Sequence, residues 1–304
     1  MGSAPRDPEE LEAAGAPVHS EIPSATRPGA VHLTVSSLDR SVGYYESVVG
    51  LTLRERGADH AFLGAGGEDL LVLVEQPGAT PARGYSGLYH FALLLPTRVD
   101  LARWLAHAAR DRVALVGLSD HYVSEAIYLS DPDDHGIEIY WDRPRASWEG
   151  QVAQRMTTLP LDTGSLLGEL ENPAHEPFEG LPPGAVMGHV HLCVADIPHT
   201  IAFYRDVLGF GLMTSLGTHA AFLSAGGYHH HIGANTWEST GAGQAPTGTA
   251  SLRQATILLP SEVERDQLVA RVAHAGQEPT ALGDGILVRD PSGNPIVLAT
   301  AEQR

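Results

Sequence analysis

The chain repeats itself, and this repetition limits the possible folds more than any other feature of the sequence. The segment GAVHLTVSSLDRSVGYYESVVGL (29–51) aligns without a gap with GHVHLCVADIPHTIAFYRDVLGF (188–210). A second segment, LYHFALLLPTRVDLARWLAHAARDRV (88–113), matches LRQATILLPSEVERDQLVARVAHAGQ (252–277). Because self-similarity at a fixed spacing indicates repeated structural units, we expect two homologous halves with two modules in each.

Each module has the same predicted order of elements. A β-rich run such as VHLTV or HFALLL precedes an amphipathic segment of about 12 residues. Asp39 with its neighbouring serines, and Thr97 after a proline, are suitable for helix starts. Two or three strands follow, separated by Gly-Gly or Asp-Pro turns. The pattern predicts an α+β protein of four βαβββ modules.

The predicted boundaries follow from this pattern and from local composition. Proline, glutamate and alanine dominate the N-terminal stretch, which is typical of disorder, and prolines also mark the connector between the halves, which contains a short helical segment at 162–171. We therefore expect a disordered lead over 1–27, an N-terminal domain over 28–145, a linker over 146–185 and a C-terminal domain over 186–300.

Composition excludes several classes of protein. The net charge is −18, with 37 acidic against 19 basic residues, which argues against a nucleic-acid or anionic membrane partner. No apolar run approaches the roughly 20 residues that span a bilayer, and no secretory signal is recognised at the start. A single cysteine, Cys193, cannot form an internal disulfide, which fits a reducing cytoplasm. The sequence leaves open whether the protein forms a homo-oligomer.

Histidines and one glutamate recur at equivalent positions of the modules. The first strands carry, in module order, His32, His90, His191 and Gln254. The last strands carry, in the same order, Leu71, Glu138, His231 and Val297. Within the first half this gives His32, His90 and Glu138, and two imidazoles with one carboxylate form a ligand set that Fe(II) accepts. The alternative interpretation is that Glu138 points outward, since strand alternation permits either face.

The paired modules and their ligand positions resemble the vicinal oxygen chelate superfamily. GLYHFALLLP, SDHYVSEAIYLSDPDDHGIEIYWDRP and GGYHHHIGANTW are most similar to bacterial CatE-like catechol 2,3-dioxygenases, and the resemblance covers about 28–300. It implies that two modules curl into an open, cup-shaped sheet around the metal. It further implies extradiol cleavage of a catechol-like aromatic diol, with Fe(II), Mn(II) or another divalent metal and O₂. Glyoxalase-type relatives usually have a fourth ligand, and Leu71 cannot supply one.

The resemblance also suggests catalytic residues. Related enzymes place a tyrosine ten residues before the ligand glutamate, and Tyr128 has this spacing to Glu138. An upstream Asp-His pair makes His121 an acid–base or substrate-orienting candidate. Those enzymes keep the metal in the C-terminal half, with a further histidine on later strands of the module that bears the first ligand. Here the matching histidine-rich strand, YHHHIG, lies in the half opposite the predicted triad.

Other interpretations remain open at this stage. His191, His231 and Gln254 offer a second, weaker metal site, or else a buried hydrogen-bonded cluster. His189 shares a strand face with His191 and is expected only to support it. A glyoxalase-like lyase or isomerase and a ligand-sequestering protein of the bleomycin-resistance type are the rival functions. Three converging metal ligands argue against the second of these.

Overall fold

The described part of the structure, a computed structural model, covers residues 21–301. Four βαβββ modules follow one another along it, as the repeats predict. The first contains β1 (Arg27–Val35), α2 (Leu38–Tyr44) with the π-helical turn η1 (Tyr45–Val49), β2 (Thr52–Arg56), β3 (His60–Gly64) and β4 (Asp69–Glu75). The second contains β6 (Gly87–Leu94), α3 (Arg98–Arg110), β7 (Leu115–Asp120), β8 (Ser124–Ser130) and β9 (Gly136–Asp142).

The C-terminal half repeats this order. The third module contains β11 (Val186–Cys193), α6 (Ile197–Ile201) with the π-helical turn η4 (Ala202–Val207), β12 (Gly211–Ser215), β13 (Ala220–Ser224) and β14 (Ile232–Asn235). The fourth contains β16 (Leu252–Leu259), α7 (Glu262–His274), β17 (Thr280–Leu282), β18 (Gly285–Arg289) and β19 (Pro295–Thr300). Shorter elements lie between modules: β5 (Thr80–Pro81), η2 (Arg145–Ser147), α4 (Val152–Arg155), β10 (Leu159–Pro160), α5 (Thr163–Leu167), η3 (Pro173–His175) and β15 (Thr249–Ala250).

Each module helix begins at a side chain that caps its first turn. Ser37 accepts a hydrogen bond from the backbone N–H of Arg40, so the capping residue of α2 is Ser37 rather than Asp39. Thr97 caps α3 in the same way, as expected. Such caps satisfy N–H groups that have no partner inside the helix, and each is worth about 1 kcal/mol. The caps therefore define the residue at which each module helix begins.

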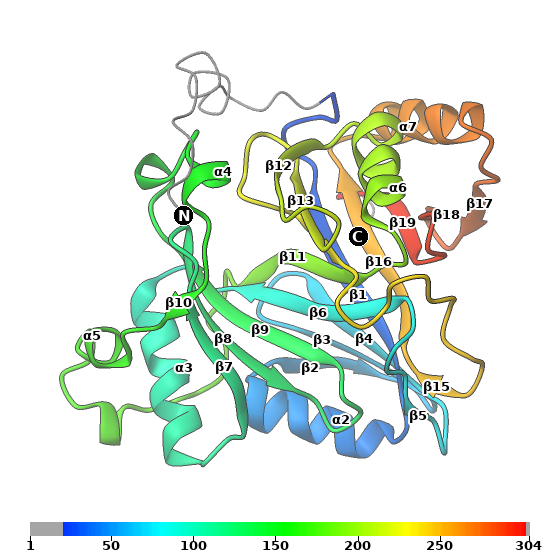
Figure 1. Ribbon diagram of the computed structural model, residues 1–304. Coiled ribbons are helices and arrows are strands. Elements are labelled where there is room, and N and C mark those ends of the chain that lie inside the picture. Colours follow the sequence, from blue (N-terminus) through cyan, green and yellow to red (C-terminus); the bar gives the residue numbers. More distant parts are fainter. Residues whose placement is uncertain (1–20, 302–304) are drawn as a thin grey trace, which may run out of the picture.

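The modules pair across the two halves instead of within them. One sheet has the order β17-β18-β19-β16-β1-β4-β3-β2 and joins the first module to the fourth. The other has the order β10-β7-β8-β9-β6-β11-β14-β13-β12 and joins the second to the third. Figure 1 shows both sheets curving through the middle of the molecule, with α2, α3, α6 and α7 around the outside. The expectation that the first two modules share one cup is therefore wrong.

A common core fastens the two sheets together. Leu33 and Leu73 from one sheet and Phe91 and Ile137 from the other belong to one buried cluster, each with 0% exposure. Strand alternation sends Phe91 and Ile137 to this core and turns His90 and Glu138 to the opposite, concave face. No helix within residues 21–301 is long and apolar enough to cross a membrane.

The last residues of the predicted N-terminal lead, 21–27, are ordered, which corrects the prediction for that part. Residues 1–20 lie outside the described residues, but 21–27 are part of the fold. Ile22 is 2% exposed, and the backbone N–H groups of Glu21 and Ile22 both donate to the carbonyl of Gly209. A single apolar side chain with two backbone hydrogen bonds is enough to order this stretch, and the composition of 1–27 as a whole concealed it.

Candidate metal centre

Four neighbouring strands place a row of residues across the concave face of the nine-stranded sheet. Tyr128 on β8 is opposite Glu138 on β9, Glu138 is beside Ala92 on β6, and Ala92 is opposite His189 on β11. Residues that face each other across strands project to the same side. His90 lies two residues before Ala92 and therefore shares this face. The small side chain of Ala92 leaves room for Glu138 and His189 to meet above it.

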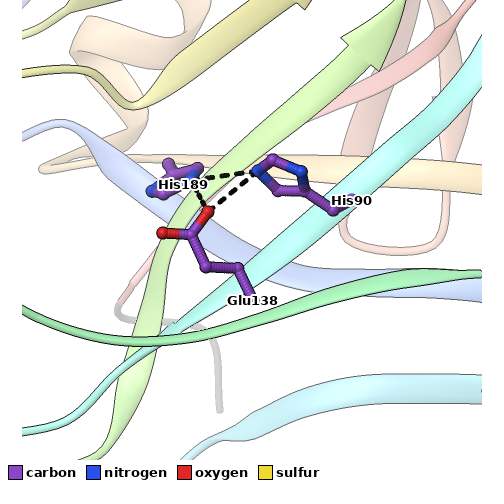
Figure 2. A group of neighbouring side chains, drawn as sticks. All are labelled: His90, Glu138 and His189. Carbon is purple, nitrogen blue, oxygen red and sulfur yellow. Dashed lines mark hydrogen bonds and ion pairs between the residues drawn. The ribbon is translucent and has the colours of Figure 1, made fainter. Parts of the chain in front are cut away.

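His90, Glu138 and His189 converge on one point. The Nε2 atoms of both histidines lie close to Oε2 of Glu138, at 3.0 Å for His90 and 3.1 Å for His189, and the two Nε2 atoms are 3.3 Å apart. Figure 2 shows the three side chains, from three separate strands, pointing toward one another. All three are buried, with exposures of 6%, 2% and 2% in the order of the sequence. Within residues 21–301 they form a group that could hold a metal ion.

The separations fit the face of a coordination octahedron. Two ligands at right angles, each about 2.1 Å from a metal, are about 3.0 Å apart, which matches the observed edges. Two imidazole nitrogens and one carboxylate oxygen that approach the same point are a donor set that a shared cation accepts. Burial raises the pKa of Glu138, but His189 and His90 outweigh this and hold it well below its usual range. Burial also lowers the pKa of His189 and favours the neutral, ligating ring.

His32 does not belong to this group, so the predicted ligand set needs a correction. It lies on β1 in the eight-stranded sheet, opposite Gln254 on β16. The pairing of the second module with the third removes it from His90 and Glu138 and brings His189 in its place. The signal for His189 was the HVH pattern on the first strand of the third module, but choosing it required knowing which modules pair.

The structure brings His121 and Tyr128 together. Nε2 of His121 lies 2.7 Å from the Tyr128 hydroxyl, and Nδ1 lies 2.7 Å from the carbonyl oxygen of Thr157. A carbonyl only accepts, so the neutral ring carries its proton on Nδ1, and Tyr128 donates to Nε2. Burial and the charge of Glu138 raise the pKa of Tyr128 well above 10. Tyr128 therefore stays a neutral hydroxyl beside the triad. Asp120, the other half of the predicted pair, binds Arg143 at 2.5 Å.

The second predicted metal set is not assembled. Gln254 lies in the other sheet, and Nδ1 of His231 accepts the backbone N–H of Ala225 at 3.1 Å. The ring of His231 stacks on Tyr228 at 4.8 Å, which agrees with a buried hydrogen-bonded role. His191 lies beside the triad instead, with its ring 4.9 Å from that of His90.

A line of hydrogen bonds leads from Asp142 to His230, which lies beside the triad. Asp142 lies 2.8 Å from Nε2 of His229, whose Nδ1 is 2.8 Å from Nδ1 of His230. Because a carboxylate accepts, Nε2 of His229 donates to Asp142. When Nδ1 of His229 accepts in turn, His230 carries its proton on Nδ1. Nε2 of His230 is thus a free base, and the ring lies 4.1 Å from that of His189. Burial lowers the pKa of His230 well below 6.5. The signal was the segment YHHHIG, but the predicted strand is wrong for its histidines, which lie in the bend between β13 and β14.

A cavity of about 500 Å³ contains these groups. His90, Glu138 and His189 line it together with His121 and His230. The same cavity thus holds three converging ligand atoms, a hydroxyl–imidazole pair and an unprotonated ring nitrogen, which are the parts needed to bind a metal and move protons beside it.

Comparison with known proteins places the chain within a family. Residues 27–139 and 186–298 each match the family model described as Glyoxalase/Bleomycin resistance protein/Dioxygenase superfamily. The chain belongs to this superfamily. Among curated proteins, a catechol-2,3-dioxygenase of Bacillus subtilis (strain 168) is 42% identical over 280 residues, which cover 90% of this chain and 96% of that protein.

Solved structures support the fold of this superfamily member. A putative dioxygenase from Bacillus subtilis matches with a TM-score of 0.64 at 15% identity, covering 91% of this chain and 86% of the other. Glyoxalase I from Zea mays matches with a TM-score of 0.54 at 18% identity, covering 91% and 92%. The predicted α+β class with paired βαβββ modules in cup-shaped sheets is confirmed.

Proposed function

We propose that the protein is an extradiol ring-cleaving dioxygenase that cleaves a catechol-like aromatic diol with O₂ and a divalent metal. Fe(II) is the first candidate for this metal. His90, Glu138 and His189 are the proposed ligands, since their Nε2 and Oε2 atoms lie within 3.3 Å of one another. This convergence of three buried ligand atoms is the observation that carries the proposal. The dioxygenase class rests on the relative that is 42% identical over most of the chain.

The overall reaction balances without another oxidant or reductant. A C–C bond of the ring next to the diol breaks, and both atoms of O₂ enter the product. When bound, the metal would supply the electron transfer between the diol and dioxygen. Three protein ligands would leave positions on the metal open to the diol and dioxygen.

The chain's own residues hold and move protons beside that reaction. His230 presents an unprotonated Nε2, which suits it to accept a proton from a diol hydroxyl. The Tyr128 hydroxyl donates to His121 Nε2, so the Tyr128 oxygen can accept a hydrogen bond from a ligand group beside the triad. The carbonyl of Thr157, from the linker between the halves, holds the His121 ring in this orientation. We assign His121 and Tyr128 catalytic roles on this basis.

The number of ligands separates this proposal from its first rival. A glyoxalase-like lyase or isomerase would use a fourth ligand from the last strand of the paired module. That strand is β14, where Gly233 lies beside His191 and offers no ligand atom, and the nearby His231 ring is held by the Ala225 N–H and by Tyr228. We also propose a cytoplasmic location. The single cysteine, Cys193, is a free thiol, which fits a reducing compartment.

Metal reconstitution and oxygen uptake test the proposed function. Protein purified without air and loaded with Fe(II) or Mn(II) should bind one metal per chain, consume O₂ with catechol and form a yellow ring-opened product. His189→Ala and Glu138→Gln should lose both metal and oxygen uptake. Isomerase activity on a glutathione hemithioacetal with Zn or Ni, without oxygen uptake, would support the lyase instead.

A further inference from the structure

The cavity extends from the buried triad to an apolar rim. His90, Glu138 and His189 are at most 6% exposed, whereas Trp237 and Leu216 at its lining are 50% and 56% exposed. Its volume of about 500 Å³ is in the range that holds drug-sized ligands, well beyond one six-membered ring. A diol bound at the triad would therefore leave much of the cavity to a substituent that points toward the rim.

Charge on the cavity wall excludes an acidic substituent. Arg83 is the one arginine or lysine among the described lining residues, and its NH2 group is bound to Asp134 at 2.8 Å. Its Nε donates to the same carboxylate oxygen at 3.1 Å. Glu238 also lines the cavity and contributes, after burial, to a raised pKa of Tyr89. Because the Arg83–Asp134 pair is neutral as a whole, Glu238 gives this part of the lining a net negative charge, and a carboxylated substituent would find no free cation there to pair with.

Aromatic rings form the wall between the triad and the rim. The rings of Tyr89 and Trp237 lie 5.2 Å apart at 77°, and His191 lies 5.2 Å from Tyr89 and 5.7 Å from Trp237. The base of this wall is held, because the buried Asn235 accepts the backbone N–H of Trp237. Half-exposed aromatic side chains at a cavity rim, held from behind, are suited to pack against an apolar ligand group.

We propose that the substrate is a catechol bearing a neutral aryl substituent, which packs against Tyr89 and Trp237 while the diol lies at the triad. This inference rests on the proposed function and adds the substrate class to it. The same wall disfavours carboxylated catechols, because Asp134 holds Arg83 and Glu238 adds a net negative charge.

A substrate panel with the metal-loaded enzyme tests this inference. Catechol, 3-phenylcatechol, 4-phenylcatechol and 3,4-dihydroxybenzoate are compared by oxygen uptake. The better phenylcatechol should exceed catechol in kcat/KM by about tenfold or more, as expected for burying an aromatic ring. The carboxylated diol should fall below catechol. Anaerobic titration of the loaded protein with the same diols measures binding independently of turnover.

Two variants locate the effect. Trp237→Ala should lower the ratio of kcat/KM for the better phenylcatechol over catechol by about tenfold, and Trp237→Phe should restore most of it. Leu282→Ala is the control, since Leu282 is similarly exposed at 43% but lies on β17 in the other sheet. It should leave the ratio unchanged.

The outcomes separate this inference from the proposed function. Cleavage of catechol without a phenyl preference, or with a preference for the carboxylated diol, would overturn the inference and leave the function standing. An absence of oxygen uptake with every diol would overturn the function. The anaerobic titration then still decides the cavity's preference, and equal binding of phenylcatechol and catechol would overturn the inference.

Discussion

Replacing His189 by alanine tests the metal centre most directly, and His32→Ala is its matched control. Both residues are histidines on the first strand of a module, but only His189 shares a sheet and a face with His90 and Glu138. Loss of His189 should therefore abolish tight metal binding, whereas loss of His32 should leave it intact. The variant His189→Ala will also be less stable without metal, because Glu138 loses a buried partner. The quantity to compare is therefore the change in Tm that added metal causes in each variant.

The expected shift follows from linkage. A metal ion that binds only the folded protein stabilises it by about 2.7 kcal/mol at a free concentration 100 times its Kd. An unfolding entropy of about 2.1 cal/mol/K per residue, over about 280 described residues, converts this to a rise in Tm of about 4–5 °C. Loss of one of three ligands should weaken binding at least about 100-fold, the upper end of the cost of losing an outer partner. The rise should then shrink to less than about 1 °C.

Thermal unfolding with and without Mn(II), after chelator treatment, measures this shift. Wild type and His32→Ala should gain the full increment, and His189→Ala should gain almost none. Metal content after dialysis provides a second reading. The opposite result, a shift lost in His32→Ala and retained in His189→Ala, would refute the assignment of ligands and with it the pairing of the second and third modules around the site.

Three further predictions follow from the same geometry. Ala92→Leu should abolish the metal-induced rise in Tm and lower the stability by about 1–3 kcal/mol, because the larger side chain would fill the space between Glu138 and His189. A full rise in Tm would show that this space is not needed. Tyr128→Phe should retain the metal shift but lower kcat about 10²-fold, through loss of the hydroxyl that bonds His121; unchanged kcat would remove Tyr128 from catalysis. Nitrogen NMR near pH 7 should find His229 protonated at Nε2 and His230 at Nδ1, and the reverse pattern would contradict the hydrogen-bond direction set by Asp142.

The βαβββ modules were predictable because their signals are local. Period-two runs, helix caps and Asp-Pro turns each act within a few residues, and the hairpin of β8 and β9 accounts for the ten-residue spacing of Tyr128 and Glu138, which are opposite each other. Membership of His90 and Glu138 in one site was predictable for the same reason, since both lie in one module. The third ligand, His189, was not predictable. Which two first strands pair with each other depends on contacts between segments that are distant in the sequence.

The observed pairing also explains the position of the histidine-rich segment YHHHIG. With the second and third modules in one sheet, His230 lies on a later part of the module that supplies the ligand His189. The resemblance predicted this relation between a ligand and a further histidine, and it was the assumed pairing within each half that made YHHHIG look misplaced. The linker also contributes residues to the site. The carbonyl of Thr157 orients His121, and Met156 and Thr158 line the cavity.

Comparison of the two sheets shows why the second one has no equivalent ligand set. His90 is opposite His191 in one sheet, and Gln254 is opposite His32 in the other, so the modules occupy corresponding registers. At these registers Gln254 corresponds to His90, Val297 to Glu138 and Ala30 to His189, so none of the three ligands is retained. A protein with this repeat needs one functional face, and the other pair of modules is then free to accumulate apolar and small residues that pack. The eight-stranded sheet thus supports the nine-stranded sheet through the shared core, and the candidate site lies on the nine-stranded sheet alone.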